Sequence, residues 1–363
     1  MAQSKTRTFG ILTSGGDCPG LNAAIRGVAR AATNEYGMNV IGISNGYRGL
    51  IDGDAKLLKS NDFSGILTQG GTILGASREK PFKFSMKDSE AGRNKVDEIK
   101  ENYRKLGLDC LVVLGGNGTQ RTAHLLQEEG LNVIGLPKTI DNDIWGTDIT
   151  FGYYSAMSIA TQAIDRLHTT ALSHNRVMIV EIMGHKAGWL ALSSGLAGGA
   201  DVICIPEIPY DPRSITSYLM NRASAGKEFS IIAVAEGAMT KDEAKLTKEE
   251  RKKKLKKNRH LSRGMILAQE IEETIDMECR VTVLGYQQRG GAPSPMDRVL
   301  STRFGIEGAK LLAEGQYGRM VCMKGDTVSS IPLSEVAGKL KTVPPDHNLV
   351  ESARMVQTCF GDT

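Results

Sequence analysis

The chain has 363 residues, enough for about two domains of ordinary size. Apolar residues make up 40% and charged residues 24%, which is typical of a globular protein and excludes a disordered or fibrous chain. The 45 basic and 41 acidic residues give a net charge of +4, too balanced for a dedicated nucleic-acid binder. No run approaches the roughly 20 apolar residues that span a bilayer, so we expect no membrane segment and a cytoplasmic location.

Short apolar segments that end in or near glycine recur along the chain and alternate with stretches of helical periodicity. The expected strands, in chain order, are residues 9–13, 39–44, 108–114, 132–136, 176–183, 202–205, 229–235 and 280–284. Because these runs are apolar on both faces, they predict parallel sheets covered by helices on both sides. The predicted fold class is α/β, with Rossmann-like αβα layers. We expect glycines, aspartates and arginines at the carboxyl ends of the strands, where ligands bind.

The first glycine-rich loop, Ser14–Gly20, joins an expected strand to a helical stretch over residues 21–32. Its free N–H groups and the helix N-terminus can hold a phosphate, although any strand-to-helix turn can contain glycine. The second loop, Gly115-Gly-Asn-Gly-Thr119, also follows a buried strand. It resembles the G-G-D-G-T signature of a kinase group that includes phosphofructokinases, NAD kinases and lipid kinases. Two such loops favour a phosphate-bearing ligand over a purely structural role.

The segment Thr139-Ile-Asp-Asn-Asp143 follows another expected strand. If it is extended, the side chains of Asp141 and Asp143 point the same way. One carboxylate can then take a proton from a hydroxyl while the other holds Mg²⁺ or orients the first. An Asx-rich turn without chemistry is the alternative.

Three arginines lie at strand edges or in a glycine-rich turn: Arg176, Arg280 and Arg289. Arginine suits bidentate contacts with phosphate, so these residues suggest a phosphorylated substrate, with surface ion pairs as the alternative. The segment Met183–Gly188 offers a further approach of backbone to ligand.

Residues 241–263 are dominated by lysine and contain no aromatic side chain. A nucleic-acid surface would mix aromatic with basic residues, so we expect a solvated surface helix or loop. Six cysteines are scattered without a C-x-x-C pair: Cys18, Cys110, Cys204, Cys279, Cys322 and Cys359. This spacing argues against disulfides or a zinc site and predicts buried free thiols.

Four motifs occur in a fixed order: residues 13–26 (TSGGDCPGLNAAIR), 71–78 (GTILGASR), 137–143 (PKTIDND) and 284–291 (LGYQQRGG). This ordered set resembles the 6-phosphofructokinase family over nearly the whole chain, whereas NAD kinases and lipid kinases share only the Gly115 loop. The resemblance implies two Rossmann-like three-layer αβα domains with mainly parallel sheets and the active site in the cleft between them. It assigns residues 1–152 with 288–343 to the nucleotide. Residues 153–287 with 344–363, including the lysine-rich segment, are assigned to fructose 6-phosphate.

The resemblance implies Mg²⁺-dependent transfer of the γ-phosphate of ATP to the 1-hydroxyl of fructose 6-phosphate, the glycolytic step that gives fructose 1,6-bisphosphate and ADP. The implied catalytic residues are Asp141 as the base, Thr139 and Asp143. The implied nucleotide site is Gly16, Arg78, Gly116, Asn117, Gly118 and Thr119. The implied fructose 6-phosphate site is Thr139, Asp141, Arg176, Met183, Gly184, His185, Glu236, Arg280, Tyr286 and Arg289. Arg176 and Arg280 match arginines that reach a neighbouring subunit's site, which implies a homotetramer.

The chain departs from the family pattern at several site positions. The family usually has aspartate where Asn117 stands, and that aspartate helps hold Mg²⁺. We keep Asn117 as the metal residue and expect weaker Mg²⁺ binding, with Asp143 or Asp17 compensating. His185 replaces the usual arginine and is charged only in part near neutral pH. Tyr286 stands where bacterial relatives often carry histidine.

The phosphoryl donor is set by two conflicting positions. Gly118 matches users of ATP, whereas users of diphosphate usually have aspartate there. Lys138 matches users of diphosphate. We give Gly118 more weight and predict ATP, with a diphosphate-dependent enzyme as the alternative. A non-catalytic sugar-phosphate sensor is a further alternative because Asn117 and His185 depart from the family, although Asp141 and the arginines are retained.

The effector site of bacterial relatives is only partly matched. Arg26, Arg30 and Lys227 agree with its cations, whereas Asp54 and His168 stand where arginines are expected. Loss of two cations weakens an anion site. We therefore expect no control by the family's anionic effectors.

Overall fold

The computed structural model describes residues 4–83, 94–257 and 261–363. The chain forms two compact units, each discontinuous in sequence. Unit 1 comprises Met1–Ile140, Ile144–Ser155 and Arg289–Lys341, and unit 2 comprises Asp141–Asp143, Ala156–Gln288 and Thr342–Thr363. Which substrate each unit binds stays a prediction.

Unit 1 is built on a seven-stranded sheet with the order β11-β10-β5-β4-β1-β2-β3. Its strands are β1 (Thr8–Thr13), β2 (Asn39–Ile43), β3 (Ala55–Leu58), β4 (Cys110–Gly115), β5 (Val133–Pro137), β10 (Arg319–Lys324) and β11 (Thr327–Pro332). The strands from β10 to β2 are parallel, and the edge strands β3 and β11 are antiparallel to their neighbours. Every residue of β4 is buried, as expected of a central strand with helices on both faces.

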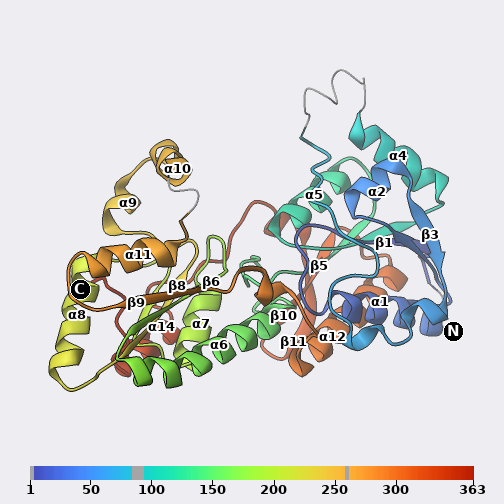
Figure 1. Cartoon of the computed structure of the whole chain (residues 1–363). Helices are drawn as coiled ribbons and strands as arrows, with labels where there is room; N and C mark the ends of the chain where they lie inside the picture. Colours follow the sequence, from blue (N-terminus) through green and yellow to red (C-terminus); the bar gives the residue numbers. More distant parts are fainter. Residues whose placement is uncertain (1–3, 84–93, 258–260) are drawn as a thin grey trace. The chain divides into compact units, whose positions relative to one another are not determined.

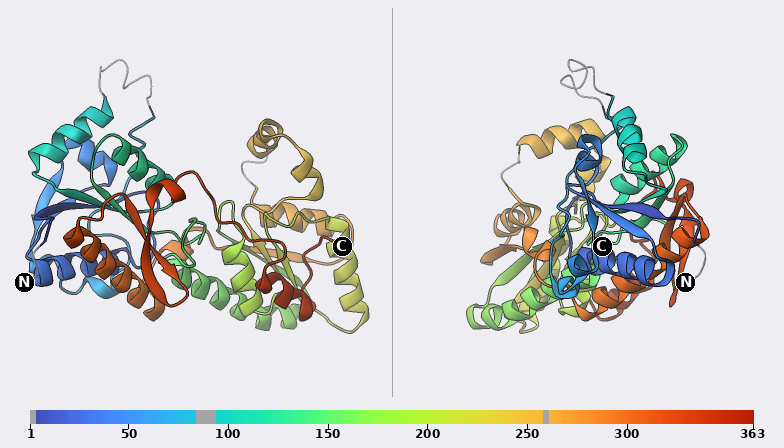
Figure 2. Two further views of the ribbon diagram at one scale, coloured as in Figure 1. Left: turned by 180° about the vertical axis from the view of Figure 1, so that it is seen from behind. Right: turned by 90° about the vertical axis from the view of Figure 1, so that its right-hand side faces the viewer.

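Helices cover both faces of this sheet (Figure 1). One face carries α1 (Leu21–Tyr36) and α12 (Pro295–Glu314), which pack side by side (Figure 2). The other face carries α2 (Tyr47–Asp52), α4 (Lys95–Lys105), α5 (Asn117–Glu128) and α13 (Leu333–Val336). Two short 3-10 helices, η1 (Ser60–Phe63) and η2 (Ile66–Thr68), lie near α1.

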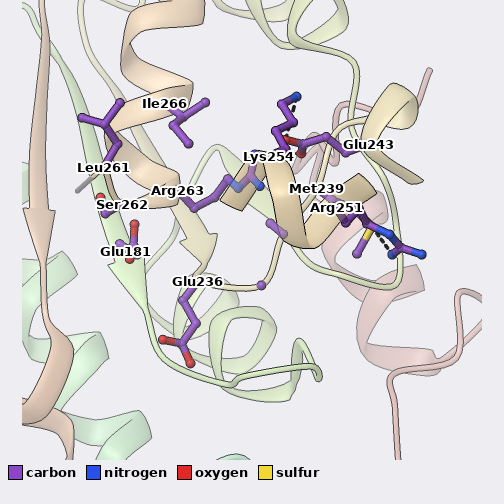
Figure 3. A pocket seen from close by; sticks show the side chains of 12 residues that line it. Glu181, Glu236, Met239, Glu243, Arg251, Lys254, Leu261, Ser262, Arg263 and Ile266 are labelled. Carbon is purple, nitrogen blue, oxygen red and sulfur yellow. Dashed lines mark hydrogen bonds and ion pairs between the residues drawn. The ribbon is translucent and has the colours of Figure 1, made fainter. Parts of the chain in front are cut away.

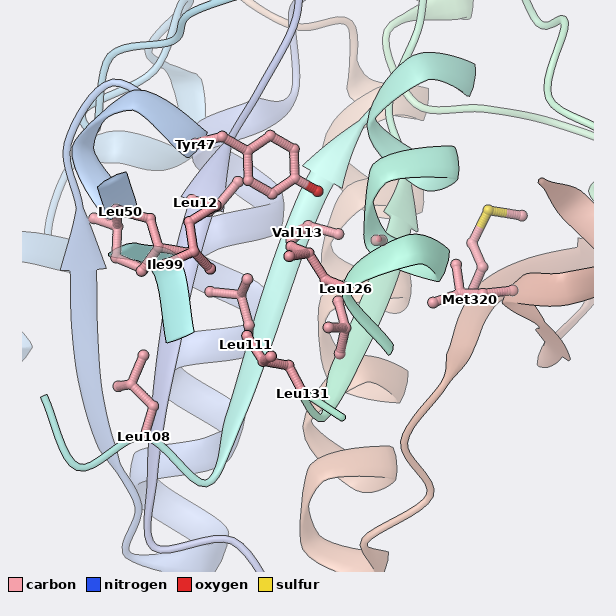
Figure 4. Close-up of a cluster of buried hydrophobic side chains, with 14 of the residues drawn as sticks. Leu12, Tyr47, Leu50, Ile99, Leu108, Leu111, Val113, Leu126, Leu131 and Met320 are labelled. Carbon is pink, nitrogen blue, oxygen red and sulfur yellow. The ribbon is translucent and has the colours of Figure 1, made fainter. Parts of the chain in front are cut away.

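The main core of unit 1 lies between the sheet and this second group of helices (Figure 4). Leu12 and Val113 project from the sheet, and Ile99 and Leu126 meet them from α4 and α5. All four are 0% exposed, and burial of each such side chain stabilises the fold by about 1.5–3 kcal/mol. This core holds the middle and last turn of α5 against β4 through Ala123 and Leu126.

Unit 2 is built on a four-stranded, wholly parallel sheet with the order β7-β8-β6-β9. Its strands are β6 (Val177–Ile182), β7 (Val202–Cys204), β8 (Ser230–Ala235) and β9 (Cys279–Val283). The remaining helices are α6 (Tyr153–His174), α7 (Trp189–Ala197), α8 (Pro212–Ser224), α9 (Lys241–Lys245), α10 (Lys248–Lys257), α11 (Arg263–Glu272) and α14 (Asn348–Met355), with the 3-10 helix η3 (Gly285–Arg289). Figure 1 shows α11 over one face of the sheet and α7 over the other.

The predicted α/β class is confirmed, and every expected strand is present. Sequence reasoning missed β3, β10 and β11; β3 and β11 are edge strands, whereas β10 has a buried apolar run followed by Gly325 and was overlooked although it fits the pattern. All six cysteines are free, but the prediction of burial is wrong for Cys359, which is partly exposed. Burial raises the pKa of the Cys18 thiol to about 12, so this thiol is unreactive. Among the described residues, no helix combines the length and apolar character needed to cross a bilayer.

Candidate active site

The first glycine loop connects β1 to α1 in unit 1. The Ser14 N–H donates to a carbonyl of β4 (3.0 Å), and the Gly15 N–H donates to the carbonyl of Ser77 (2.9 Å), the residue before Arg78. These two N–H groups are therefore used by the backbone, which corrects the expectation that the whole loop is free. The N-cap of α1 is Gly20, with no side-chain cap and no acidic residue in the first turn. Residues 18–25 are buried, however, so this helix start is closed to an outside anion, and the accessible part of the loop is residues 15–17.

The second glycine loop connects β4 to α5. The N-cap of α5 is Gly116, again without a side-chain cap or an acidic residue in the first turn, which contains Asn117, Gly118 and Thr119. A Cβ atom on Gly118 would meet no atom of the described residues within 4 Å. The hydroxyl of Tyr47 donates to the carbonyl of Thr119 (3.2 Å) and holds this turn from the core side. The start of α5 is therefore uncapped and has open space beside Gly118, as a phosphate site requires, and its role as the nucleotide loop stays a prediction.

Two cations lie against the first glycine loop. Lys138, which is 3% exposed, donates from Nζ to the carbonyl of Gly16. Nη1 of Arg289 donates to the carbonyl of Asp17 (3.1 Å). A Cβ atom on Gly16 would overlap the Arg289 guanidinium, so a larger residue here would displace this side chain. The structure thus places Arg289 at the predicted nucleotide loop, and its expected role toward fructose 6-phosphate stays a prediction.

The acidic segment Thr139–Asp143 follows β5. Asn142 has a φ of 51°, in the left-handed region, so the segment is not extended. The premise that Asp141 and Asp143 alternate as in a strand is therefore wrong. The hydroxyl of Thr150 donates to the carbonyl of Thr139 (2.8 Å), which fixes the start of the segment. Asp143 is buried and Asp141 is partly exposed, and their catalytic roles stay predictions.

The predicted sugar-phosphate loops of unit 2 lie at the carboxyl ends of adjacent parallel strands. Met183, Gly184 and His185 follow β6, and Glu236 follows β8. Oε1 of Glu236 accepts the His185 N–H (2.8 Å), and Oε1 of Gln288 accepts the Met183 N–H (2.9 Å). His185 has a φ of 52°, uncommon for a residue with a side chain, and the bond to Glu236 holds it there. Tyr286 is 74% exposed on η3.

Arg176 and Arg280 lie elsewhere on the sheet. Arg176 precedes β6, and Arg280 is near the start of β9, which runs parallel to β6. Both arginines pair with Glu278. The expectation that the arginines lie at the carboxyl ends of strands is wrong for these two, which lie at the amino ends of β6 and β9. They therefore do not join Met183 and Glu236 within one subunit.

A cavity of about 280 Å³ lies beside Glu236, between the sheet, α11 and the lysine-rich segment (Figure 3). Glu243 and Arg263 form an ion pair at 2.9 Å, with each side chain 8% exposed, and Nζ of Lys254 lies 3.0 Å from Glu243. Burial opposes the charge, but hydrogen bonds from the Thr240 N–H, Lys254 and Arg263 outweigh it and lower the pKa of Glu243. The expectation of a solvated segment 241–263 is therefore wrong at Glu243 and Arg263, which anchor it.

Two further carboxylates hold loops in unit 2 and were missed by sequence reasoning. Glu181, 8% exposed, accepts the Gly264 N–H at the start of α11 (2.7 Å). Glu207 accepts the N–H groups of Gly188 (3.0 Å) and Val343 (2.9 Å), and burial raises its pKa. A charged residue inside an apolar strand segment is a signal for Glu181, whereas nothing in the sequence marks Glu207.

The described residues contain no group of three or more His, Cys, Asp and Glu side chains arranged to hold a metal ion. Mg²⁺ is commonly bound through one or two protein oxygens together with substrate phosphates and water. Asn117 offers an amide oxygen in the first turn of α5, where a phosphate would bind, so its donor chemistry fits Mg²⁺.

The predicted family can now be tested by comparison with known proteins. Residues 8–312 match the family described as phosphofructokinase. The chain belongs to the phosphofructokinase family. A relative from Spirochaeta thermophila, named ATP-dependent 6-phosphofructokinase, is 67% identical over 364 residues, with 100% of both chains covered. ATP-dependent 6-phosphofructokinase 3 from Bacteroides thetaiotaomicron is 54% identical over 353 residues, covering 97% of this chain and 99% of that one.

Solved phosphofructokinases share the fold. The phosphofructokinase from Saccharomyces cerevisiae aligns with a TM-score of 0.77 and 31% identity, over 91% of this chain and 45% of the yeast chain, so this chain spans less than half of that one. A pyrophosphate-dependent phosphofructokinase from Marinobacter aquaeolei aligns with a TM-score of 0.78 over 97% of this chain and 92% of that chain. At 20% identity, the second likeness concerns the fold alone. The predicted family and fold are confirmed.

Proposed function

We propose that this chain transfers the γ-phosphate of ATP to the 1-hydroxyl of fructose 6-phosphate, giving fructose 1,6-bisphosphate and ADP. The observation that carries this proposal is the 67% identity, over the whole chain, to a protein named ATP-dependent 6-phosphofructokinase. The start of α5 in unit 1 supports it, because this helix begins at an uncapped glycine with open space beside Gly118.

The proposed reaction is an in-line displacement. Asp141 takes the proton from the sugar 1-hydroxyl as that oxygen attacks the γ-phosphorus. The bond from the γ-phosphorus to the bridging oxygen breaks, and ADP leaves with the electron pair. Thr139 contacts the transferred group, and Asp143 supports the base. Positioning and charge neutralisation dominate such a reaction, and the N-terminus of α5, Lys138 and Arg289 would supply both in unit 1.

Fructose 6-phosphate is assigned to the loops after β6 and β8. Met183, Gly184, His185 and Glu236 would hold the sugar there. Arg176 and Arg280 lie at the amino ends of β6 and β9, away from these loops, which supports the proposal that they bind substrate in the site of a neighbouring subunit. We therefore propose a homotetramer with shared active sites, acting in the cytoplasm without a membrane or nucleic-acid partner.

Mg²⁺ is part of the proposal, and when bound it neutralises phosphate charge. Asn117 would help hold it through an uncharged amide oxygen. We expect Asn117→Asp to lower the Mg²⁺ concentration needed for half-maximal rate, because a carboxylate adds charge to the oxygen donor. The measurement is a Mg²⁺ titration of the initial rate at fixed ATP. Asn34→Asp, at an exposed position of α1, is the control, and equal behaviour of the two variants would remove Asn117 as a ligand.

The donor is tested directly by initial rates with fructose 6-phosphate, Mg²⁺ and either ATP or diphosphate. Turnover with ATP alone is expected. Asp141→Ala should lower this rate about 10²- to 10⁴-fold. Turnover with diphosphate alone would overturn the donor assignment and make Lys138 the deciding residue. If neither donor is used while fructose 6-phosphate still binds, the chain is a sugar-phosphate sensor and the proposal fails.

A further inference from the structure

Two buried glutamines lie behind the predicted substrate loops, one in each unit. Gln120 and Gln288 are both 0% exposed. We propose that Gln120 is a positioning residue for the nucleotide loops and Gln288 a positioning residue for the sugar-phosphate loops, and that the two act independently. The inference rests on the proposed function, because it concerns loops assigned to ATP and fructose 6-phosphate.

Gln120 joins the carboxyl ends of two neighbouring strands of unit 1. Its Nε2 donates to the carbonyl of Gly115 at the end of β4 (3.0 Å) and to that of Leu136 near the end of β5 (2.9 Å). Because both partners are carbonyls, the amide nitrogen must face them. The residues that follow these carbonyls are Gly116–Thr119 and Pro137–Thr139, predicted to contact the nucleotide and the transferred phosphate.

Gln288 joins the end of β6 to η3 in unit 2. Its Oε1 accepts the Met183 N–H (2.9 Å), the first backbone N–H after β6. Because the partner is an N–H group, the amide oxygen must face it. Gln288 thereby ties Met183, and with it Gly184, to the short helix that carries Tyr286.

Each glutamine uses only one end of its amide. Oε1 of Gln120 and Nε2 of Gln288 are buried and have no hydrogen-bond partner among the described residues. A buried polar atom without a partner costs stability, so packing alone would favour methionine at both positions. The amides are explained by the bonds that they do make. Gln120 acts as a donor and Gln288 as an acceptor, so substitution by glutamate should affect them differently. Glutamate keeps the acceptor oxygen that Gln288 uses but removes the N–H donor that Gln120 uses.

The first part of the test concerns Gln288 in the full-length protein. Gln288→Met removes the acceptor, and we expect KM for fructose 6-phosphate to rise about tenfold while KM for ATP stays near wild type. Gln288→Glu keeps an oxygen facing Met183, so its KM for fructose 6-phosphate should lie much nearer to wild type. If the methionine variant does not fold, Gln288→Asn, which is too short to reach Met183, replaces it with the same expectation.

The second part concerns Gln120. Both Gln120→Met and Gln120→Glu remove the donor, and we expect each to raise KM for ATP about tenfold while KM for fructose 6-phosphate stays near wild type. The glutamate variant should be the worse of the two, because its carboxylate faces two carbonyl oxygens. Gln120→Asn is the substitute if either variant fails to fold.

Three results would overturn the inference. They are a methionine variant that raises both KM values equally, a Gln288→Glu variant as impaired as Gln288→Met, and variants with lowered melting temperature but wild-type KM values. Failure of the proposed function is separate, because the wild-type chain would then show no turnover. In that case the shift of melting temperature by fructose 6-phosphate alone and by ATP alone still reports which loop each glutamine positions.

Discussion

The helices that follow the two glycine loops of unit 1 begin differently from α7 and α11 of unit 2. In unit 1, α1 and α5 begin at glycine, and no side chain caps them. In unit 2, Glu181 accepts the Gly264 N–H at the start of α11, and Glu207 accepts the N–H of Gly188, the N-cap of α7. Unit 2 thus satisfies with its own carboxylates the kind of donors that unit 1 leaves for a ligand at the start of α5. A helix N-terminus at a sheet edge becomes an anion site only where the chain provides no acceptor of its own.

The largest expected effect tests whether the carboxylates of unit 2 are structural. Arg263→Met should lower the free energy of unfolding by about 3 kcal/mol, because it leaves Glu243 buried with the half-exposed Lys254 as its cationic partner. Urea unfolding measures this change. Lys254→Met is the matched control, since Lys254 is 49% exposed and its loss should cost at most about 1 kcal/mol. Equal losses in both variants would contradict a special role for the buried pair.

The next effect comes from placing a carboxylate at a helix N-terminus of unit 1, as unit 2 has at α7 and α11. Gly118→Asp places a carboxylate in open space in the first turn of α5. We expect KM for ATP to rise about tenfold to a hundredfold by like-charge repulsion, with unfolding unaffected or slightly improved by the helix dipole.

Gly118→Ala is the control for this substitution, because it fills the same space without charge. Its KM for ATP should change far less than that of the aspartate variant. Equal effects would mean that space, not charge, is decisive at the start of α5.

The smallest effect is a pH dependence of stability in unit 2. Burial raises the pKa of Glu207, so the folded state binds more protons than the unfolded state above the ordinary pKa. The contribution of Glu207 is therefore fully present below the unfolded pKa of 4.5 and is lost as pH rises through the folded pKa. Glu207→Gln should flatten the melting temperature against pH across that window. The exposed substitution Glu273→Gln should leave the slope as in wild type, and a wild-type slope in Glu207→Gln would refute the assignment.

The sequence was sufficient to predict the fold class. The central strands are buried on both faces, and this burial appears in the sequence as continuous apolar runs that end near glycine. It was insufficient for β3 and β11, since edge strands bury less and carry a weaker pattern, whereas the buried run of β10 was a signal that was overlooked. Strand direction, more than nearness in the sequence, also determines which residues can meet at one site. Arg176 and Met183 belong to one expected strand segment, yet they lie at opposite ends of β6.

The two glycine loops lie between a strand and a helix as predicted, because a strand, a loop and a helix in succession are local features of the sequence. The contacts that hold those loops are not local. Gln288 is far from Met183 in sequence, and Glu207 is far from Val343. Nor could the sequence foresee the left-handed Asn142, which bends the acidic segment. Such bonds and bends depend on tertiary packing, which a single sequence does not reveal.

The discontinuity of the two units has a consequence for protein synthesis. The strand β5 pairs with β10, so the sheet of unit 1 is unfinished until residues 289–341 have left the ribosome. Unit 2 is likewise incomplete until residues 342–363 follow. A nascent chain therefore exposes the open edge of β5 while most of unit 2 is being translated, and open strand edges promote aggregation. A premature stop after residue 288 would leave neither half complete, so quality control, not partial function, is the expected fate of truncated chains.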